Sequence, residues 1–104
     1  MPLNRLEALK TMVASDTKNA LARYGLAMEY ANSGDLERAV TEYQVLLEVK
    51  PDYAAAYYHG GQALEKLGRK DEARAFYTLG IEVTTRTGDE HTRSELQGAL
   101  DLLG

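Results

Sequence analysis

Two histidines are the side chains of this sequence best suited to acid–base chemistry or metal binding at neutral pH. His91 directly follows Asp89 and Glu90, so three potential metal ligands stand in a row. Adjacent residues on a helix point in different directions, which makes this run a poor metal site. Acidic residues at the start of a helix are better explained by capping and by the helix dipole. Neither His59 nor His91 has a serine at the spacing of a catalytic pair.

The glycine pair Gly60–Gly61 is the one candidate for a phosphate-binding loop. Such a loop lies between a strand and a helix, whereas this pair lies inside a predicted helix. The 104 residues include no cysteine, which excludes thiol chemistry, disulfides and cysteine-containing zinc sites. We therefore expect no enzyme, no catalytic residue, no cofactor and no metal.

The charge balance and the hydropathy exclude two further kinds of partner. The chain has 16 acidic and 12 basic residues and a net charge of −4, whereas nucleic-acid binding depends on clustered Lys and Arg. No apolar run approaches the roughly 20 residues of a membrane helix, and the N-terminus lacks the pattern of a secretion signal. We expect no nucleic-acid or membrane partner and, in the absence of a targeting signal, a cytoplasmic location.

The elements that position these residues follow an internal repeat. Residues 20–53 align without a gap on residues 54–87, and the identities include one glycine and two tyrosines in fixed register. Residues 20 and 54 begin the two aligned units, so the distance between them along the chain is the repeat length. A repeat of this length indicates a stack of similar units that bury their core between neighbours. The matched pairs are Ala20 and Ala54, Tyr24 and Tyr58, Gly34 and Gly68, Ala39 and Ala73, Tyr43 and Tyr77, Glu48 and Glu82, and Val49 and Val83.

Each unit is predicted to be two helices joined by a tight turn, because apolar residues recur at spacings of three and four. Gly34 ends the first helix of the first unit, and Asp35 caps the second. Pro51 ends that second helix. Asp52 then stands where a cap for the next helix is expected.

The flanking segments are predicted to be one further helix each. Residues 1–17 stand one repeat length before the second helix of the first unit, so they behave as the second helix of an incomplete preceding unit. Residues 88–104 form a C-terminal capping helix, and Thr87 and Glu90 have the spacing of a capping box before it. Thr85 replaces a helix-ending proline, which extends the preceding helix to about Arg86.

These features resemble the tetratricopeptide repeat. That pattern places small residues where the two helices cross closely and an aromatic beside them; the matching positions are Ala27, Gly61, Ala39, Ala73, Tyr43 and Tyr77. The resemblance implies one all-α domain over residues 1–104, in which antiparallel helix-turn-helix repeats stack as a short right-handed superhelix. Gly60 and Gly61 together predict either an unusually close helix approach or a soft turn.

The resemblance also implies a protein–protein interaction module, in which the first helices of successive units line a concave groove that binds a peptide or a partner helix. The groove is expected to be aromatic and apolar at one end and polar at the other, and Tyr24 and Tyr58 are expected to form an exposed ladder. The candidate partner-binding residues are Leu21, Tyr24, Met28, Asn32, Tyr58, His59, Gln62, Glu65 and Lys66.

Chaperone-binding members of the family hold a terminal carboxylate with Lys, Asn and Arg side chains. Here Tyr24 and Met28 occupy the expected Lys and Asn positions, and His59 occupies that of the next Asn. We therefore expect no binding of an acidic chaperone tail.

Three alternatives stay open at this point. The paired tyrosines are also compatible with simple packing between units. The chain is either a monomer or a homodimer that associates through its end helices, because each carries an apolar stripe. A third interpretation is a module of a longer array, although Met1 suggests a natural start. The stripes consist of Leu3, Leu6, Leu9 and Val13 at one end and Leu96, Leu100 and Leu103 at the other.

Overall fold

A computed structural model describes residues 4–104, which form six helices and no strand. The helices are α1 (Arg5–Ser15), α2 (Ala20–Asn32), α3 (Leu36–Val49), α4 (Ala54–Lys66), α5 (Lys70–Thr87) and α6 (Glu90–Leu103). Residues 1–3, which include the predicted stripe residue Leu3, lie outside the described part. None of the six helices is both long and apolar enough to cross a bilayer.

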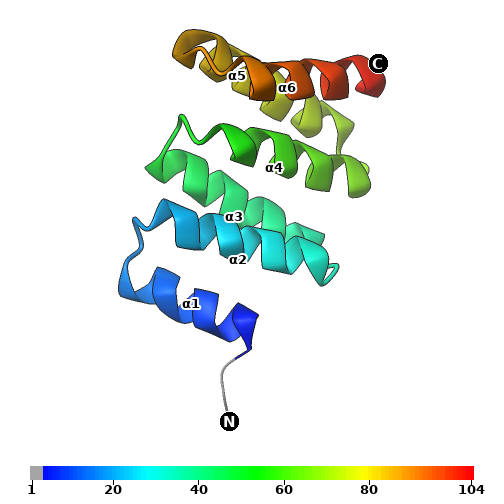
Figure 1. Cartoon of the computed structure of the whole chain (residues 1–104). Helices are drawn as coiled ribbons and strands as arrows, with labels where there is room; N and C mark the ends of the chain where they lie inside the picture. Colours follow the sequence, from blue (N-terminus) through cyan, green and yellow to red (C-terminus); the bar gives the residue numbers. More distant parts are fainter. Residues whose placement is uncertain (1–3) are drawn as a thin grey trace.

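The helices form an elongated stack with extents of 46 × 29 × 19 Å. α2, α4 and α6 lie on one side of the stack, and α3 and α5 lie behind them (Figure 1). Each helix packs mainly against its neighbours in the sequence, and α2, α4 and α6 also contact one another in that order. The predicted all-α repeat architecture is thereby confirmed.

The turns inside the two units follow the predicted local rules. Gly34 and Gly68 have φ angles of 89° and 77°, in the left-handed region that glycine adopts without steric cost. The Asp35 side chain accepts a hydrogen bond from the backbone N–H of Arg38 and so caps α3. α3 ends at Val49, shortly before Pro51, as expected.

Two predicted caps are wrong. The residue that precedes α4 is Tyr53 rather than Asp52, and no side chain caps this helix. The capping box at Thr87 is also absent, because Thr87 is the last residue of α5 and Asp89 caps α6 by accepting from the N–H of Thr92. Both helices therefore start slightly later than the predicted caps imply.

The extension of α5 changes the register of α6. As predicted from Thr85, α5 continues past the length of α3, and it ends at Thr87 before Gly88. Tyr53, which precedes α4, follows Asn19, which precedes α2, by one repeat length. Asp89, which precedes α6, stands two positions farther along than one repeat length after Tyr53. α6 therefore occupies the place of a third first helix, with its register shifted by two positions.

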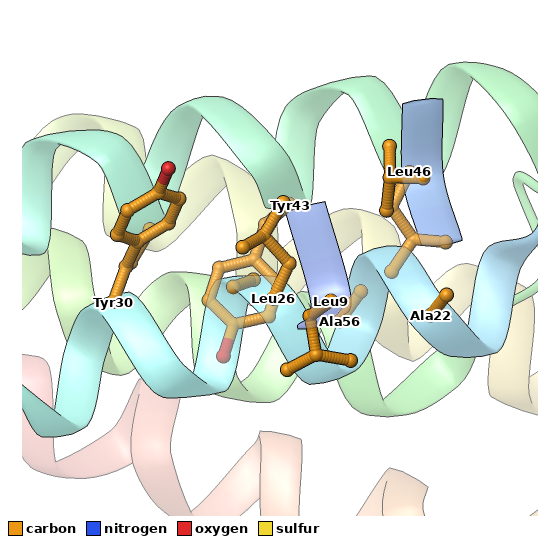
Figure 2. Packing of buried hydrophobic residues seen from close by; sticks show 10 residues of the cluster. Leu9, Ala22, Leu26, Tyr30, Tyr43, Leu46 and Ala56 are labelled. Carbon is orange, nitrogen blue, oxygen red and sulfur yellow. The ribbon is translucent and has the colours of Figure 1, made fainter. Parts of the chain in front are cut away.

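The core consists of two clusters rather than one centre, as expected for a stack. The first joins α1, α2, α3 and the start of α4, and it includes Leu26, Tyr43 and Leu46 (Figure 2). The second joins α3 to α6 around Leu64, Tyr77 and Leu96, all of them fully buried. Neighbouring units are thus held together by contacts with the next helix pair.

The glycine pair marks a close approach of α4 to α5, which resolves the two predicted alternatives. A methyl group at Gly61 would lie 2.7 Å from Cδ1 and Cζ of the buried Tyr77 ring. One at Gly60 would lie 2.7 Å from Cδ2 of Phe76. Both glycines are therefore needed where aromatic rings of α5 press against the α4 backbone.

Candidate functional site

The nine predicted binding residues all lie on α2 and α4, on the side where α6 continues the row of first helices; we call this surface the α2–α4–α6 face (Figure 1). Leu21, Asn32 and Lys66 are exposed on it, and the exposed fraction of Leu21 is 72%. The other six are half-buried: Tyr24, Met28, Tyr58, His59, Gln62 and Glu65. The face therefore offers side chains that are partly packed and partly accessible.

The aromatic residues of this face form one cluster rather than a ladder of two exposed tyrosines. The Tyr24 ring lies 5.2 Å from that of Tyr53 and 5.9 Å from that of His59, and His59 lies 5.3 Å from Tyr58. His59 thus stands between the two predicted tyrosines. Its burial lowers the pKa of the imidazole below its ordinary value, which favours the neutral ring.

Tyr53 is a member of this cluster that the sequence did not point to as a site residue. It precedes α4, and the Lys50 ammonium lies 5.8 Å from the centroid of its ring. Its counterpart one repeat length earlier is Asn19, so the repeat register gave no aromatic to compare. Its place directly after Pro51-Asp52, in the turn between two units, is the sequence signal that could have identified it.

A polar cluster lies farther along α4 and depends on a side chain from α5. The Tyr77 hydroxyl donates to the Glu65 carboxylate and accepts from Gln62 Nε2 at 2.7 Å. Burial, followed by the bond to Glu65, raises the pKa of Tyr77 well above its ordinary value, so the hydroxyl keeps its proton. Because Gln62 uses its N–H here, its carbonyl oxygen remains to accept a hydrogen bond from a ligand.

The tyrosine at the matching position of the first unit lies in an apolar environment. Tyr43, one repeat length before Tyr77, donates its hydroxyl to the Met28 sulfur at 3.0 Å. Met28 is the register counterpart of Gln62, and Ala31 is that of Glu65. The face therefore changes from apolar on α2 to polar on α4.

An open cleft of about 480 Å³ lies between α1 and α2 and opens beside Leu21, Tyr24 and Met28. Leu9 and Met12 of α1 supply its other apolar wall. Leu9 was predicted only as part of the N-terminal apolar stripe, and neither residue was predicted as part of a binding site. Leu9 and Met12 stand one repeat length before Tyr43 and Leu46. This register placed them on a second helix, and it was the sequence signal available for their position.

An ion pair lies at one part of this cleft. Arg5 Nε lies 2.9 Å from Glu29 Oε2, and both residues line the cleft. Arg5 stands one repeat length before Ala39 and two before Ala73, which are fully buried at the close helix crossings. A long charged side chain thus occupies the position where both interior units have a methyl group.

α6, which was predicted only as a C-terminal capping helix, also supplies residues to the α2–α4–α6 face. In the shifted register of α6, the positions that match the binding residues of α4 are all exposed: Ser94, Glu95, Gly98, Asp101 and Leu102. The carboxylate of Glu95 also acts on His59, opposing the effect of burial on its pKa. Glu95 is therefore near enough to His59 for its charge to act on the imidazole.

The histidines are not combined into a chemical site. His91 lies on the exposed part of α6, with Nε2 3.6 Å from the Glu95 carboxylate. Among residues 4–104, no three His, Asp or Glu side chains gather as a metal site. What the face offers is apolar area, aromatic rings and a few hydrogen-bonding groups.

The sequence matches two family models, one described as TPR repeat over residues 27–68 and one as tetratricopeptide repeat over residues 54–85. A TPR repeat-containing protein from Pseudomonas aeruginosa is 33% identical over 91 residues, which make up 88% of this chain and 87% of that protein. The chain belongs to the tetratricopeptide repeat family. The resemblance stated from the sequence is thereby confirmed.

Two solved structures with a similar fold are informative here. The crystal structure of a tetratricopeptide repeat domain protein from Salinibacter ruber has 38% identity and a TM-score of 0.77, covering 82% of this chain and 94% of that one. PcrH, in complex with the chaperone binding region of PopD, has a TM-score of 0.89 at 15% identity and covers 94% of this chain and 74% of its own. The second likeness is one of fold alone.

Proposed function

We propose that this chain is a protein-interaction module that binds a segment of a partner protein on the α2–α4–α6 face. The observation that carries the proposal is the cleft of about 480 Å³ between α1 and α2, whose apolar wall is continuous with that face. PcrH, whose fold is similar to that of this chain, forms a complex with the chaperone binding region of PopD. The tetratricopeptide repeat is a scaffold for such recognition, and the partner is determined by the side chains of the face.

Binding would gain most from the apolar side chains that are still open to water. Leu21 is 72% exposed and Met12 is 48% exposed, and both line the cleft. Complete burial of such a side chain contributes about 1.5–3 kcal/mol. Asn32 and the free carbonyl oxygen of Gln62 supply hydrogen-bonding groups for a partner backbone.

The face offers little to a terminal carboxylate. Tyr24 and Met28 lie at the predicted clamp positions and carry no positive charge. His59 is half-buried, with a lowered pKa. We therefore expect an acidic C-terminal peptide to show no low-micromolar binding in a titration.

The test compares substitutions on two exposed leucines that differ in their place. Leu21→Glu puts a charge on the cleft, whereas Leu79→Glu puts the same charge on α5, where the leucine is 50% exposed and lines no described cleft. Proteins captured from the source lysate by the wild-type chain should be lost with Leu21→Glu and kept with Leu79→Glu. The double variant Tyr24→Ala, Tyr58→Ala should lose them too. Equal capture by all variants would show that binding occurs elsewhere.

Self-association through the end helices is the competing function. The predicted stripes are largely used inside one chain: Leu9 and Val13 pack on α2, and Leu96 and Leu103 are buried in the second cluster. Leu102, 90% exposed, lies outside the C-terminal stripe. These contacts favour binding of a partner over pairing of end helices.

A further inference from the structure

We infer that the bound segment is apolar where it lies over α2 and carries lysine or arginine where it reaches α4 and α6. This inference rests on the proposed function and adds the chemistry and placement of the partner. It depends on the change in character of the α2–α4–α6 face along the stack, from an apolar cleft to fixed and exposed carboxylates. Each part of that change comes from a different helix.

The apolar end is the cleft between α1 and α2. Its exposed apolar side chains, Leu21 and Met12, are flanked by the half-buried Met28, and the Tyr43 hydroxyl is already bonded to the Met28 sulfur. The Arg5 and Glu29 charges in the lining are paired with each other. The open part of the cleft therefore favours aliphatic or aromatic side chains over charged ones.

The polar end begins at Glu65 on α4. Its carboxylate accepts the Tyr77 hydroxyl, and the Tyr77 side chain is fully buried below the α4 backbone at Gly61. The carboxylate is thereby oriented, and it keeps acceptor capacity for a further donor. Gln62 adds a free carbonyl oxygen, so this part of the face presents acceptors.

α6 continues the acidic character. Glu95 and Asp101 match His59 and Glu65 in the shifted register, and both are exposed. Residues 89–104 contain four acidic side chains and one Lys or Arg side chain, Arg93, which is bonded to Glu90 at 2.8 Å. The exposed cation of the predicted site, Lys66, lies on α4 at the cleft of about 110 Å³ between α2 and α4. The side-chain charges that α6 itself carries are thus net negative, which complements a basic segment.

The length of the partner segment follows from the helix spacing. Packed helices lie about 8–10 Å apart, so the path from α2 across α4 to α6 is about 20 Å. An extended chain advances about 3.3 Å per residue. A segment of about six residues, apolar first and basic afterwards or the reverse, is long enough to reach both ends.

A library of random displayed peptides provides a probe that needs no known partner. Selection on the wild-type chain, with the Leu21→Glu chain as counter-selection, should enrich peptides with apolar residues at one end and an excess of Lys and Arg at the other. Apolar peptides without that basic excess would overturn the inference and leave the proposed function standing. Failure to enrich any peptide that depends on Leu21 would overturn both.

A charge reversal on α6 then tests the placement. For a selected peptide, the double variant Glu95→Lys, Asp101→Lys should raise the dissociation constant by about tenfold or more at low salt, because two favourable pairs become unfavourable. Glu82→Lys together with Glu48→Lys makes the same change in net charge at exposed positions of α5 and α3. A loss of affinity that is equal in both double variants would show only a general charge effect and would contradict binding at α6.

Discussion

At the residue scale, Gly61 determines how closely α4 packs on α5. Gly61→Ala would place a methyl group 2.7 Å from two atoms of the Tyr77 ring, and that ring is fully buried and bonded at its hydroxyl. We expect this substitution to lower the free energy of unfolding by about 1–3 kcal/mol, as is usual for an overpacked core. Chemical denaturation measures the change.

Gly98 is the matched control for that substitution. It lies inside α6, is exposed, and a methyl group there would have no neighbour within 4 Å. Gly98→Ala should therefore raise the free energy of unfolding by about 0.5–1 kcal/mol through helix propensity. If both alanines acted in the same direction, the close approach at Gly61 would not be what limits that position.

His59 should make stability depend on pH. Burial lowers the pKa of its imidazole in the folded chain, whereas the unfolded chain has the ordinary value of about 6.5. The unfolded state therefore binds the proton more readily, and the free energy of unfolding should fall as the pH drops from about 7.5 to 5.5. The measurement is a series of denaturation curves in the background His91→Gln, so that His59 is the single histidine present.

His59→Gln in the same background should flatten that pH dependence. A slope that persists without any histidine would have to come from another titrating group and would contradict this role of His59. The sign matters as well, because stability that increased on acidification would indicate a raised pKa.

At the element scale, the start of α6 is assigned to Asp89. Its side chain accepts from the N–H of Thr92, and this bond lowers the pKa of the carboxyl group. We expect Asp89→Ala to lower the stability of the chain, because the N–H of Thr92 then loses its side-chain acceptor. Thermal unfolding followed by circular dichroism measures the loss.

Thr87→Ala separates this assignment from the capping box predicted at Thr87. Thr87 is the last residue of α5, and its hydroxyl lies 3.5 Å from the Thr84 carbonyl oxygen. Its removal should change stability by less than about 0.5 kcal/mol. A larger loss of stability with Thr87→Ala than with Asp89→Ala would indicate that Thr87, and not Asp89, caps α6.

The outcome at these elements shows what local sequence rules determine. Gly34 and Asp35 were predicted correctly, because a left-handed turn and a side-chain cap depend on a few consecutive residues. The start of α6 was not, because both Thr87 and Asp89 satisfy those rules and the choice depends on how far α5 continues along its packing surface. The register shift of α6 follows from that choice.

The candidate site was predicted in the same partial way. The repeat register placed the α2 and α4 residues on one face, because equivalent positions of a repeat face the same side. The bond from Tyr77 to Glu65 depends on the depth of packing at Gly61, and the α1–α2 cleft depends on what leaves α1 uncovered. The spacing of residues along the sequence does not determine such tertiary distances.

At the scale of the whole molecule, the two core clusters make every helix dependent on its neighbours. The stripe residues that the structure describes take part in these internal contacts: Leu6, Leu9 and Val13 on α1, and Leu96, Leu100 and Leu103 on α6. We therefore expect a monomer at micromolar concentration. Light scattering coupled to gel filtration measures the oligomeric state. The variant Leu102→Ser, which removes the 90% exposed leucine of α6, is compared with the wild-type chain. A dimer that dissociates with Leu102→Ser would support assembly through α6 and weaken the case for partner binding.

Arg5 has a consequence for anyone who wishes to lengthen this protein by design. Its side chain stands in the register position of Ala39 and Ala73 and is tied to Glu29. A helix added against α1 would meet that side chain at the point of closest crossing. An extended array built on this side should therefore assemble with Arg5→Ala and resist assembly without it. This one substitution would allow a further helix to pack against α1.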